Sequence, residues 1–466
     1  MKTLWLMLLF SLHGNAQDTI LGFSEYFAMV KRFHPAVKQA NLEISMAQAS
    51  LLEARGAFDP KLEAEYYTKN YEGKHYYSLR SGAFTIPTWF GIEMKAGFEQ
   101  HSGAYLNPQN SVPDSGLSSI GIKVPVGQGL LINERMAALK RARLMVAQSR
   151  ADRRLEIATV LYRAAQAYFD WKRQYDEYAV YRDAVAIASQ RMKGIRSLAE
   201  AGDRPAIDSI EAGIALRSRM LSLEDAQLKL EKARLALSNY LWAPDDVPLE
   251  LGTQMVPQQD LIDDIAAHLQ TEIDETPDLS RHPKIESLAL KISVLEVEQR
   301  LKANLLLPRI DLSYARLAPG STFDPAYPDD YRAGVNLSFP LFLRKERGGL
   351  QLARFKSRDA KFDLEIQKLE IANTIGAAKA ELLSLAKQQA LTNRIVEDTR
   401  AMLTAEERLF AYGESSVFLV NAREANGIVA RLQQIAMQYR RLMAHAELFR
   451  ILAPVIADAP GGTIAR

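Results

Sequence analysis

An internal repeat constrains the fold of this 466-residue chain more than any other feature. The stretch FHPAVKQANLEISMAQASLLEARGAFDPKLEAEYY begins at Phe33, and RHPKIESLALKISVLEVEQRLKANLLLPRIDLSYA begins at Arg281. In both stretches a His-Pro pair opens a proline-free run, and a second proline ends that run after the same number of residues. Self-similarity of this kind indicates a repeated structural unit, so the chain is expected to build one set of elements twice.

Each repeat is predicted to contain a helix, a strand, a loop, a second strand, a very long helix, a turn and a returning helix. Proline suits the first turn of a helix and disfavours a helical residue before it, so each His-Pro pair predicts a helix start. Period-two alternation predicts the strands. The first repeat (17–242) then has a helix at 36–57, strands at about 61–126, a long helix at 133–201 and a return helix at 206–241. The second repeat (279–452) has a helix at 284–306, strands at about 309–339, a long helix at 344–412 and a return helix at 417–452. A connector is predicted at 243–278 and a flexible tail at 453–466.

The two long helices are proline-free, and each would extend about 100 Å if continuous. Small and apolar residues recur along both at steps of three or four, which is typical of coiled coils and helical tubes. Two amphipathic helices of a globular bundle are the alternative interpretation. The predicted seams are Leu144, Ala147, Ala151, Leu155, Ala158, Tyr162, Ala165 and Phe169 in the first helix, and Phe362, Ile366, Leu369, Asn373, Gly376, Ala380 and Leu383 in the second.

The repeats differ in the segment between their strands. The first repeat holds residues 70–117 there, whereas the second holds only 318–332. The insert contains two alternating stretches, HYYSLRSGAFTI and WFGIEMKAGFEQ. They are compatible with an extra hairpin or with a long external loop, and we favour a surface loop.

The N-terminal residues indicate export. Lys2 precedes an apolar run from Leu4 to Leu12, and Gly14-Asn15-Ala16 places small residues where a signal peptidase cleaves. Residues 1–16 are therefore predicted to be a signal peptide. No later stretch has the roughly 18 apolar residues of a membrane-spanning helix.

The composition offers little for catalysis or nucleic-acid binding. Lys and Arg number 58 against 56 Asp and Glu, so no basic field attracts nucleic acid. Cysteine is absent, which excludes disulfides and thiolate chemistry. No HExxH, phosphate loop or GxSxG motif occurs, and His34 and His282 are explained by their helix-start positions. We predict no enzyme activity, no cofactor and no metal.

Two further stretches give the chain a family resemblance. FPLFLRKERGG (339–349) lies where a strand leads into a long helix, and RLFAYGESSVFLVNARE (408–424) lies at the far turn. Together with the duplicated His-Pro start, they resemble the TolC-like outer-membrane efflux proteins, also called outer-membrane factors. The resemblance covers about residues 24–452. It implies a mainly α fold with a β-barrel portion, formed by two structural repeats of long coiled-coil helices with two strands each.

The same resemblance implies a homotrimer with a shared transmembrane β-barrel in outer-membrane lipid and a helical barrel in the periplasm. It implies an outer-membrane channel of a tripartite efflux or type I secretion system, with a periplasmic adaptor and an inner-membrane pump of the RND or ABC type as partners. Four strands are too few to close a barrel, so three copies would supply about twelve strands, or about eighteen if the insert adds a hairpin. We favour twelve. A soluble periplasmic coiled-coil scaffold or adaptor is the alternative function.

The resemblance also implies candidate site residues at two places. The helix turns would form a periplasmic tip, in which Asp208 matches a position where the family commonly has aspartate, whereas the corresponding second-repeat positions are Leu419 and Ala422. The tip candidates are Gly202, Asp203, Asp208, Glu211, Gly413, Glu414, Arg423 and Glu424. The predicted helix–strand transitions are Pro60, Pro125, Pro308 and Pro340.

Overall fold

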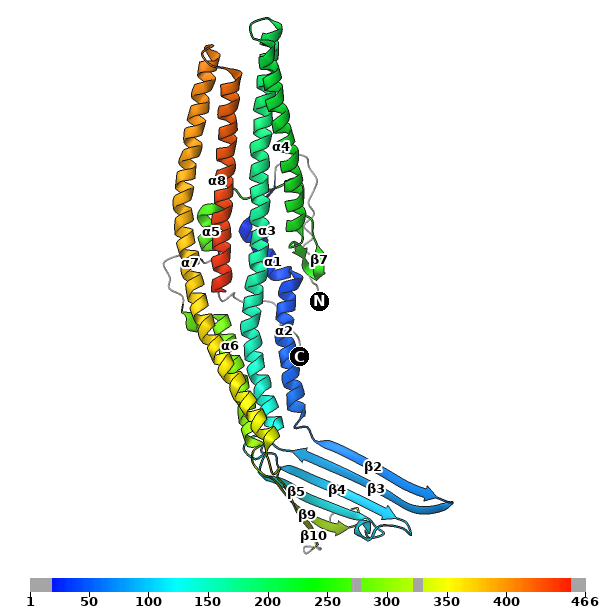
Figure 1. The fold of residues 1–466 in the computed structure, drawn as a ribbon. Helices are drawn as coiled ribbons and strands as arrows, with labels where there is room; N and C mark the ends of the chain where they lie inside the picture. Colours follow the sequence, from blue (N-terminus) through cyan, green and yellow to red (C-terminus); the bar gives the residue numbers. More distant parts are fainter. Residues whose placement is uncertain (1–18, 270, 272–277, 322–329, 454–466) are drawn as a thin grey trace, which may run out of the picture. The chain divides into compact units, whose positions relative to one another are not determined.

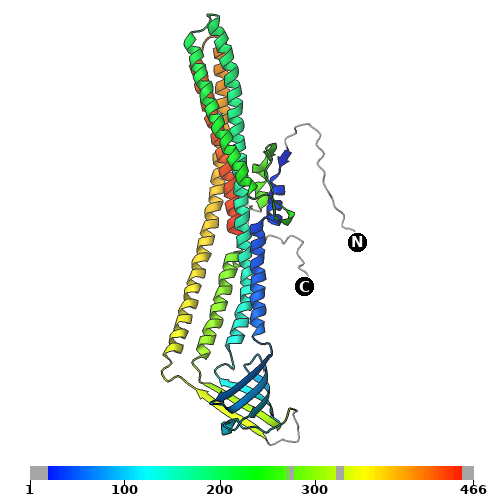
Figure 2. The ribbon, with the colours of Figure 1, turned by 90° about the vertical axis from the view of Figure 1, so that its right-hand side faces the viewer.

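The structure is a computed structural model that describes residues 19–269, 271, 278–321 and 330–453 (Figures 1 and 2). The predicted signal peptide and all but the first residue of the predicted tail lie outside these residues. Among the described helices, none has the length and apolar composition that a membrane crossing requires.

The chain divides into two compact units that do not coincide with the repeats. We call residues 1–40, 154–278 and 370–466 the helical unit, and residues 41–153 and 279–369 the sheet unit. Each unit contains segments of both repeats. The reason is that α3 (Glu134–Glu200) and α7 (Arg344–Ala411) each begin in the sheet unit and end in the helical unit.

The helical unit contains the later parts of α3 and α7 and the helices that return from them. Its remaining elements are β1 (Thr19–Leu21), α1 (Phe23–Phe33), α4 (Ala206–Ser238), β6 (Trp242–Ala243), β7 (Val247–Pro248), β8 (Met255–Pro257), α5 (Leu261–Leu269) and α8 (Val417–Leu452). β1 pairs parallel with β8, and β6 pairs antiparallel with β7.

An aromatic cluster forms the core of the helical unit. Phe23, Tyr26, Tyr168 and Phe169 are fully buried, and the ring of Phe23 lies 5.2 Å from that of Phe169. The Tyr26 hydroxyl donates to the carbonyl of Ala164 at 3.0 Å, so a buried polar atom is satisfied. Burial raises the pKa of Tyr168 to about 12.

The predicted seam of α7 is wrong, because a different face of this helix is buried within the chain. Phe362 and Leu369 are largely exposed, whereas the buried residues include Ile375, Ala378, Leu382 and Leu385. The buried residues also step by three and four, but on another face of the helix. On α3 the predicted Ala151, Ala158, Ala165 and Phe169 are buried.

The sheet unit contains one six-stranded antiparallel sheet in the order β10-β9-β5-β4-β3-β2 (Figure 1). The sheet is joined to α2 (Pro35–Gly56), α6 (Pro283–Asn304) and the early parts of α3 and α7. Its strands are β2 (Lys61–Tyr71), β3 (Lys74–Pro87), β4 (Glu93–Ser102), β5 (Leu117–Gly127), β9 (Arg309–Pro319) and β10 (Tyr331–Ser338).

Our preference for a surface loop in the first repeat is wrong. The insert forms the hairpin β3–β4, which lies in the sheet between β2 and β5. The physical reason is the period-two alternation of both stretches, which pair along their length with neighbouring strands. Glu72 and Gly73, both at positive φ, form the two-residue turn that enters β3.

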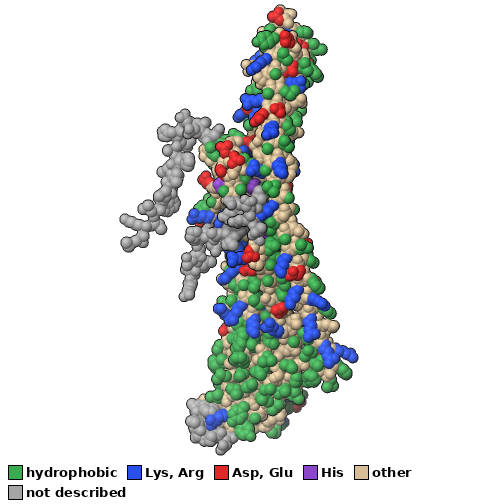
Figure 3. All heavy atoms as spheres, turned by 90° about the vertical axis from the view of Figure 1, so that its left-hand side faces the viewer, with side chains coloured by type: hydrophobic (Ala, Val, Ile, Leu, Met, Phe, Trp, Pro, Cys, Tyr) green, Lys and Arg blue, Asp and Glu red, His purple; other side chains and the backbone are tan. Residues whose placement is uncertain are grey.

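The sheet has one apolar and one polar face. Residues paired across an antiparallel ladder point to the same side of the sheet. The strand register therefore shows which residues lie on each face. The apolar face includes Leu62, Phe84, Ile86, Met94, Ala96, Ile120, Ile122, Leu312, Tyr314, Val335 and Leu337, together with the charged Arg80 and Arg316. The opposite face includes Lys61, Glu63, Glu65, Ser81, Glu93, Lys95, Glu99, Lys123, Arg309, Asp311, Ser313 and Asn336. In Figure 3 hydrophobic side chains gather on the part of the surface to which this sheet belongs.

Buried His445 predicts a pH-dependent stability of the helical unit. Burial, assisted by the nearby charge of Arg441, lowers the pKa of His445 from 6.5 to about 4. Between pH 6.5 and 4 the unfolded chain therefore binds a proton at His445 that the folded chain does not bind. As the pH is lowered through that window, the free energy of unfolding should fall by on the order of 3 kcal/mol. Denaturant unfolding at pH 7 and pH 5 measures this, and His445→Gln should remove this contribution. An unchanged pH dependence in the variant would contradict the assignment.

Candidate functional sites at the helix turns and the strand–helix junction

The turns after the long helices are built alike. Gly202, with φ of +86°, follows α3, and Gly413, with φ of +82°, follows α7. The N–H of Gly202 donates to the carbonyl of Ala199 at 3.2 Å, and the Asp203 N–H donates to that of Leu198 at 2.9 Å. Gly413 and Glu414 make the corresponding bonds to Phe410 and Leu409. Each glycine therefore ends a helix in the left-handed conformation, which disfavours any other residue type.

The structure brings the two turns together through side chains of the helical unit. Ile195, Ala212 and Val417 are buried in one small apolar cluster, against which Phe410 packs. The Arg204 guanidinium lies over the ring of Phe410, 4.5 Å from its centroid. Arg204 also pairs loosely with Asp208 at 3.9 Å. Asp208 therefore pairs with Arg204 in the turn after α3, and Arg204 in turn contacts Phe410 at the end of α7.

The other predicted tip residues divide into exposed and buried groups. Asp203 and Glu414 are exposed, and Glu211 is half-buried. The Nε of Arg423 lies 3.4 Å from Oε2 of Glu406, which joins α8 to α7. Glu424 is different, since it is buried among charges from other helices.

A buried charge cluster surrounds Glu424. Its carboxylate pairs with Arg191 of α3 and, at 3.2 Å, with Arg219 of α4. Arg191 also reaches Glu407 of α7 at 3.3 Å. The exposed fractions of the paired side chains are 13% for Arg191, 9% for Arg219 and 5% for Glu424. Three helices therefore meet at the Glu424 carboxylate, and α7 joins them through the Arg191–Glu407 pair; we call these four side chains the Glu424 cluster.

Burial lowers the pKa of Arg219, as does the charge of Arg191, whereas Glu424 raises it. In the part of the chain that the structure describes, Oε1 of Glu424 has no hydrogen-bond partner. Glu424 also borders a hollow of about 510 Å³ lined by α3, α7 and α8. Two buried guanidinium groups therefore share the Glu424 carboxylate, and Arg219 has its ion pair through it.

Glu424 is one of the predicted tip residues, whereas Arg191 and Arg219 are not among them. A signal was present in each helix. Arg219 falls at a seven-residue interval between the buried Ala212 and Ala226, and Arg191 steps by three and four from the buried Ala188 and Ile195. A charge on an otherwise small or apolar stripe indicates a buried ion pair.

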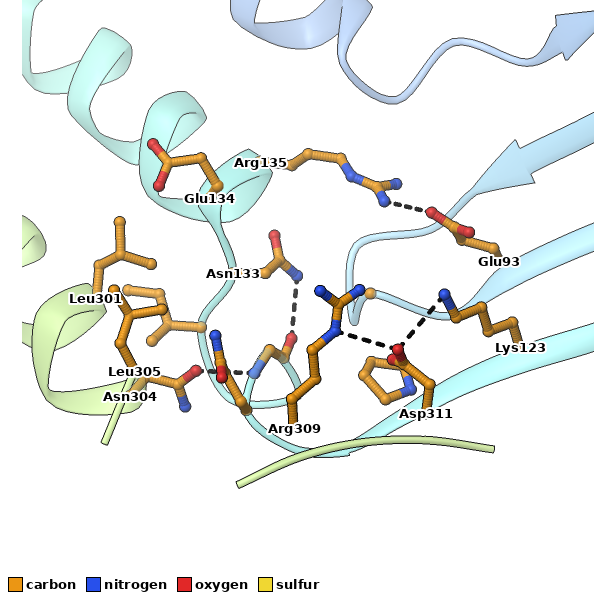
Figure 4. Close-up of a pocket in the computed structure, with 15 residues that line it drawn as sticks. Glu93, Lys123, Asn133, Glu134, Arg135, Leu301, Asn304, Leu305, Arg309 and Asp311 are labelled. Carbon is orange, nitrogen blue, oxygen red and sulfur yellow. Dashed lines mark hydrogen bonds and ion pairs between the residues drawn. The ribbon is translucent and has the colours of Figure 1, made fainter. Parts of the chain in front are cut away.

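The second candidate site lies in the sheet unit, where helices lead into strands (Figure 4). It is a cavity of about 310 Å³ lined by the end of α6, the start of α3, and strands β5 and β9. Asp311, 8% exposed, lies 3.1 Å from Nε of Arg309 and 3.5 Å from Nζ of Lys123. Glu93 pairs with Arg135 at 2.5 Å. The charges pair with one another, which suits a structural junction rather than a reaction centre.

The predicted transition prolines lie at or near this junction. Pro60 directly precedes β2, and Pro308 directly precedes β9. Pro340 lies between β10 and α7, whereas Pro125 lies inside β5 and lines the cavity. The carbonyl of Pro308 accepts from the N–H of Gln128 at 3.1 Å. Among the described residues, no group of three or more His, Cys, Asp or Glu side chains lies together as a metal site would require.

Asn304→Ala is expected to weaken the junction. The buried Asn304 side chain accepts from the Gly129 N–H at 2.8 Å, so truncation leaves that donor unpaired. The expected loss is about 1–3 kcal/mol of unfolding free energy. Thermal unfolding followed by circular dichroism measures it. Leu131→Ala is the control, because Leu131 is 76% exposed and should change stability little; equal effects of both variants would contradict the role given to Asn304.

Long helical hairpins joined to a two-faced antiparallel sheet define the fold of outer-membrane channels, and the comparisons support this class. The chain is similar to the CmeC outer membrane channel of Campylobacter jejuni, with a TM-score of 0.64 and 12% identity over 92% of this chain and 85% of that one. It is similar to the outer membrane protein VceC of Vibrio cholerae, with a TM-score of 0.64 and 15% identity over 92% and 95%. The MtrE outer membrane channel of Neisseria gonorrhoeae in its open state gives 0.66 and 13% over 95% and 93%.

A sequence match to a known family covers the C-terminal part of the chain. Residues 278–453, which include the second repeat up to the end of α8, match the family Outer membrane efflux protein. No significant match to a curated protein sequence was found. The resemblance predicted from the sequence is confirmed: residues 278–453 match the outer membrane efflux protein family, and the chain has the fold of the TolC-like outer membrane channels.

Proposed function

We propose that this protein is the outer-membrane channel of a tripartite efflux or type I secretion system and works as a homotrimer. The sheet of each copy would join a shared barrel in the outer membrane, and the long helices would form a tube in the periplasm. The turns at Gly202 and Gly413 would meet a periplasmic adaptor joined to an RND or ABC pump. The channel itself would be passive, since the pump supplies the energy.

One observation carries the proposal: the apolar face of the sheet is exposed. Leu62 is 81% exposed, Val335 74% and Leu337 66%. Soluble proteins rarely expose a continuous apolar surface of this kind, whereas an outer-membrane wall needs an apolar outer face and a polar inner face. A soluble periplasmic scaffold, the alternative, would leave that face in water.

The test is location together with conductance. After export in a Gram-negative host, the protein should stay with the outer membrane through high-salt and carbonate washes. Purified protein should then give discrete current steps in a planar lipid bilayer. Release of the protein by carbonate, with no current steps, would favour the scaffold and reject the channel.

We also propose that the tip residues narrow the periplasmic end. Asp208→Ala removes the partner of Arg204, which should loosen the contact of Arg204 with Phe410 and raise single-channel conductance. Bilayer recordings at fixed salt measure this. Glu250→Ala is a control, because Glu250 is exposed and lies outside the turns; unchanged conductance in Asp208→Ala would remove Asp208 from the gate.

A further inference from the structure

We propose that the β3–β4 hairpin is part of the channel wall, so that three copies of this chain close a barrel of eighteen strands. The proposal rests on the proposed function, because it takes the three-copy assembly from there. It concerns what each copy contributes: six strands in one continuous sheet, rather than the four that the repeats alone supply.

The pairing of the hairpin supports a place in the wall. β3 pairs with β2 from Lys74 to Thr85, and with β4 from Ser78 to Pro87. β4 then pairs with β5 from Glu93 to Glu99. β2 has no other neighbour among the described strands, so it joins the sheet only through this hairpin. An external loop would instead leave β2 paired with β5.

The two-faced pattern continues through the hairpin. Along one row of partners Leu62, Phe84, Ala96 and Ile120 share the apolar face. Along another row Glu65, Ser81 and Glu99 share the polar face. Direct partners in an antiparallel ladder lie on the same side of the sheet. The apolar face of the hairpin therefore continues the apolar face of β2 and β5, and its polar face continues theirs.

Both ends of the hairpin are fixed within the sheet unit. At the turn between β3 and β4, the ring of Trp89 stacks on Phe58 at 5.6 Å, and the Trp89 carbonyl accepts from Asn133 at 3.3 Å. On the polar face, Glu99 of β4 pairs with Arg332 of β10 at 3.2 Å. These contacts tie the hairpin to both repeats.

The free edges fit a second copy of this chain. Every residue of β2 and of β10 is exposed. Because six antiparallel strands alternate in direction, β2 and β10 run in opposite directions. The β10 edge of one copy can therefore pair antiparallel with the β2 edge of the next, and lipid tolerates no open edge. Barrel diameter grows roughly linearly with strand number, so eighteen strands give a lumen about 1.5 times as wide as twelve.

The test uses single cysteines, since the natural chain has none. The full-length protein in outer-membrane vesicles is treated with a charged, membrane-impermeant methanethiosulfonate. Ser81→Cys and Thr85→Cys place a thiol on the polar face of β3, and Ala96→Cys places one on the apolar face of β4. Ser313→Cys and Leu312→Cys are the matched pair on β9, which does not depend on the hairpin.

We expect both polar-face positions of β3 to react at least tenfold faster than Ala96→Cys, and Ser313→Cys at least tenfold faster than Leu312→Cys. If the β9 pair differs but the hairpin positions react alike, the hairpin lies outside the wall and the eighteen-strand inference fails while the channel stands. If the β9 pair also reacts alike, the channel itself fails, and the inference with it.

Discussion

Glu424→Gln is expected to destabilise the helical unit more than any other single change at the tip. Glu424 is the carboxylate shared by Arg191 and Arg219, so its loss removes the ion pair of the buried Arg219 and leaves Arg191 paired only with Glu407. Removing one partner of a buried ion pair typically costs about 3–5 kcal/mol. The measurement is denaturant unfolding of the purified full chain, followed by the helical circular dichroism signal.

A matched control and a double variant test whether the loss of stability comes from the buried ion pair. Asp208→Ala breaks a pair that is longer, at 3.9 Å, and more exposed, so it should change stability by less than about 1 kcal/mol. Glu424→Leu combined with Arg219→Leu removes one positive charge together with the carboxylate and should recover part of the loss. Wild-type stability in Glu424→Gln would show that the cluster does not hold these helices together.

Gly121→Ala is expected to disrupt the sheet where the two repeats join. Gly121 lies in β5 opposite Ala315 of β9. An added Cβ would lie 2.6 Å from the Cβ of Ala315 and 2.7 Å from its Cα, and would also meet the Tyr314 carbonyl oxygen. Backbone atoms cannot move aside as a flexible side chain can, so β5 and β9 must separate. Overpacking of this kind costs about 1–3 kcal/mol or more.

The expected outcome for Gly121→Ala is a several-fold loss of folded protein in the outer membrane. Trypsin resistance of the membrane fraction measures it, since separated strands expose cleavable backbone. Gly82→Ala in β3 is the matched control, because nothing lies within 4 Å of its added Cβ. Equal protease resistance of the two variants would contradict the close approach of β5 to β9.

The periodic parts of this fold could be predicted from the sequence. Proline before a strand, as at Pro60 and Pro308, and glycine after a long helix, as at Gly202 and Gly413, are local signals that tertiary contacts do not override. The fold class, mainly helical with strands, followed from these signals. The structure places α3 over Glu134–Glu200 and α7 over Arg344–Ala411, where the sequence has its longest proline-free runs.

Other features could not be predicted from the sequence, because they depend on contacts between segments that are far apart in the chain. The alternation of the insert is compatible with a hairpin or a loop, and only its pairing with β2 and β5 shows that it forms strands of the sheet. The buried face of α7 was misplaced because Phe362 and Ile366 resemble core residues but lie exposed. Arg191 and Arg219 were missed because their partner Glu424 comes from another hairpin, more than two hundred positions away along the chain.

The most direct test of the channel is electron microscopy of the detergent-extracted protein, with images averaged without imposed symmetry. Three copies around one axis should appear, with eighteen strands closing a wall at one end and helices forming a tube of on the order of 100 Å. A single copy, or an assembly without a closed wall of strands, would contradict the account.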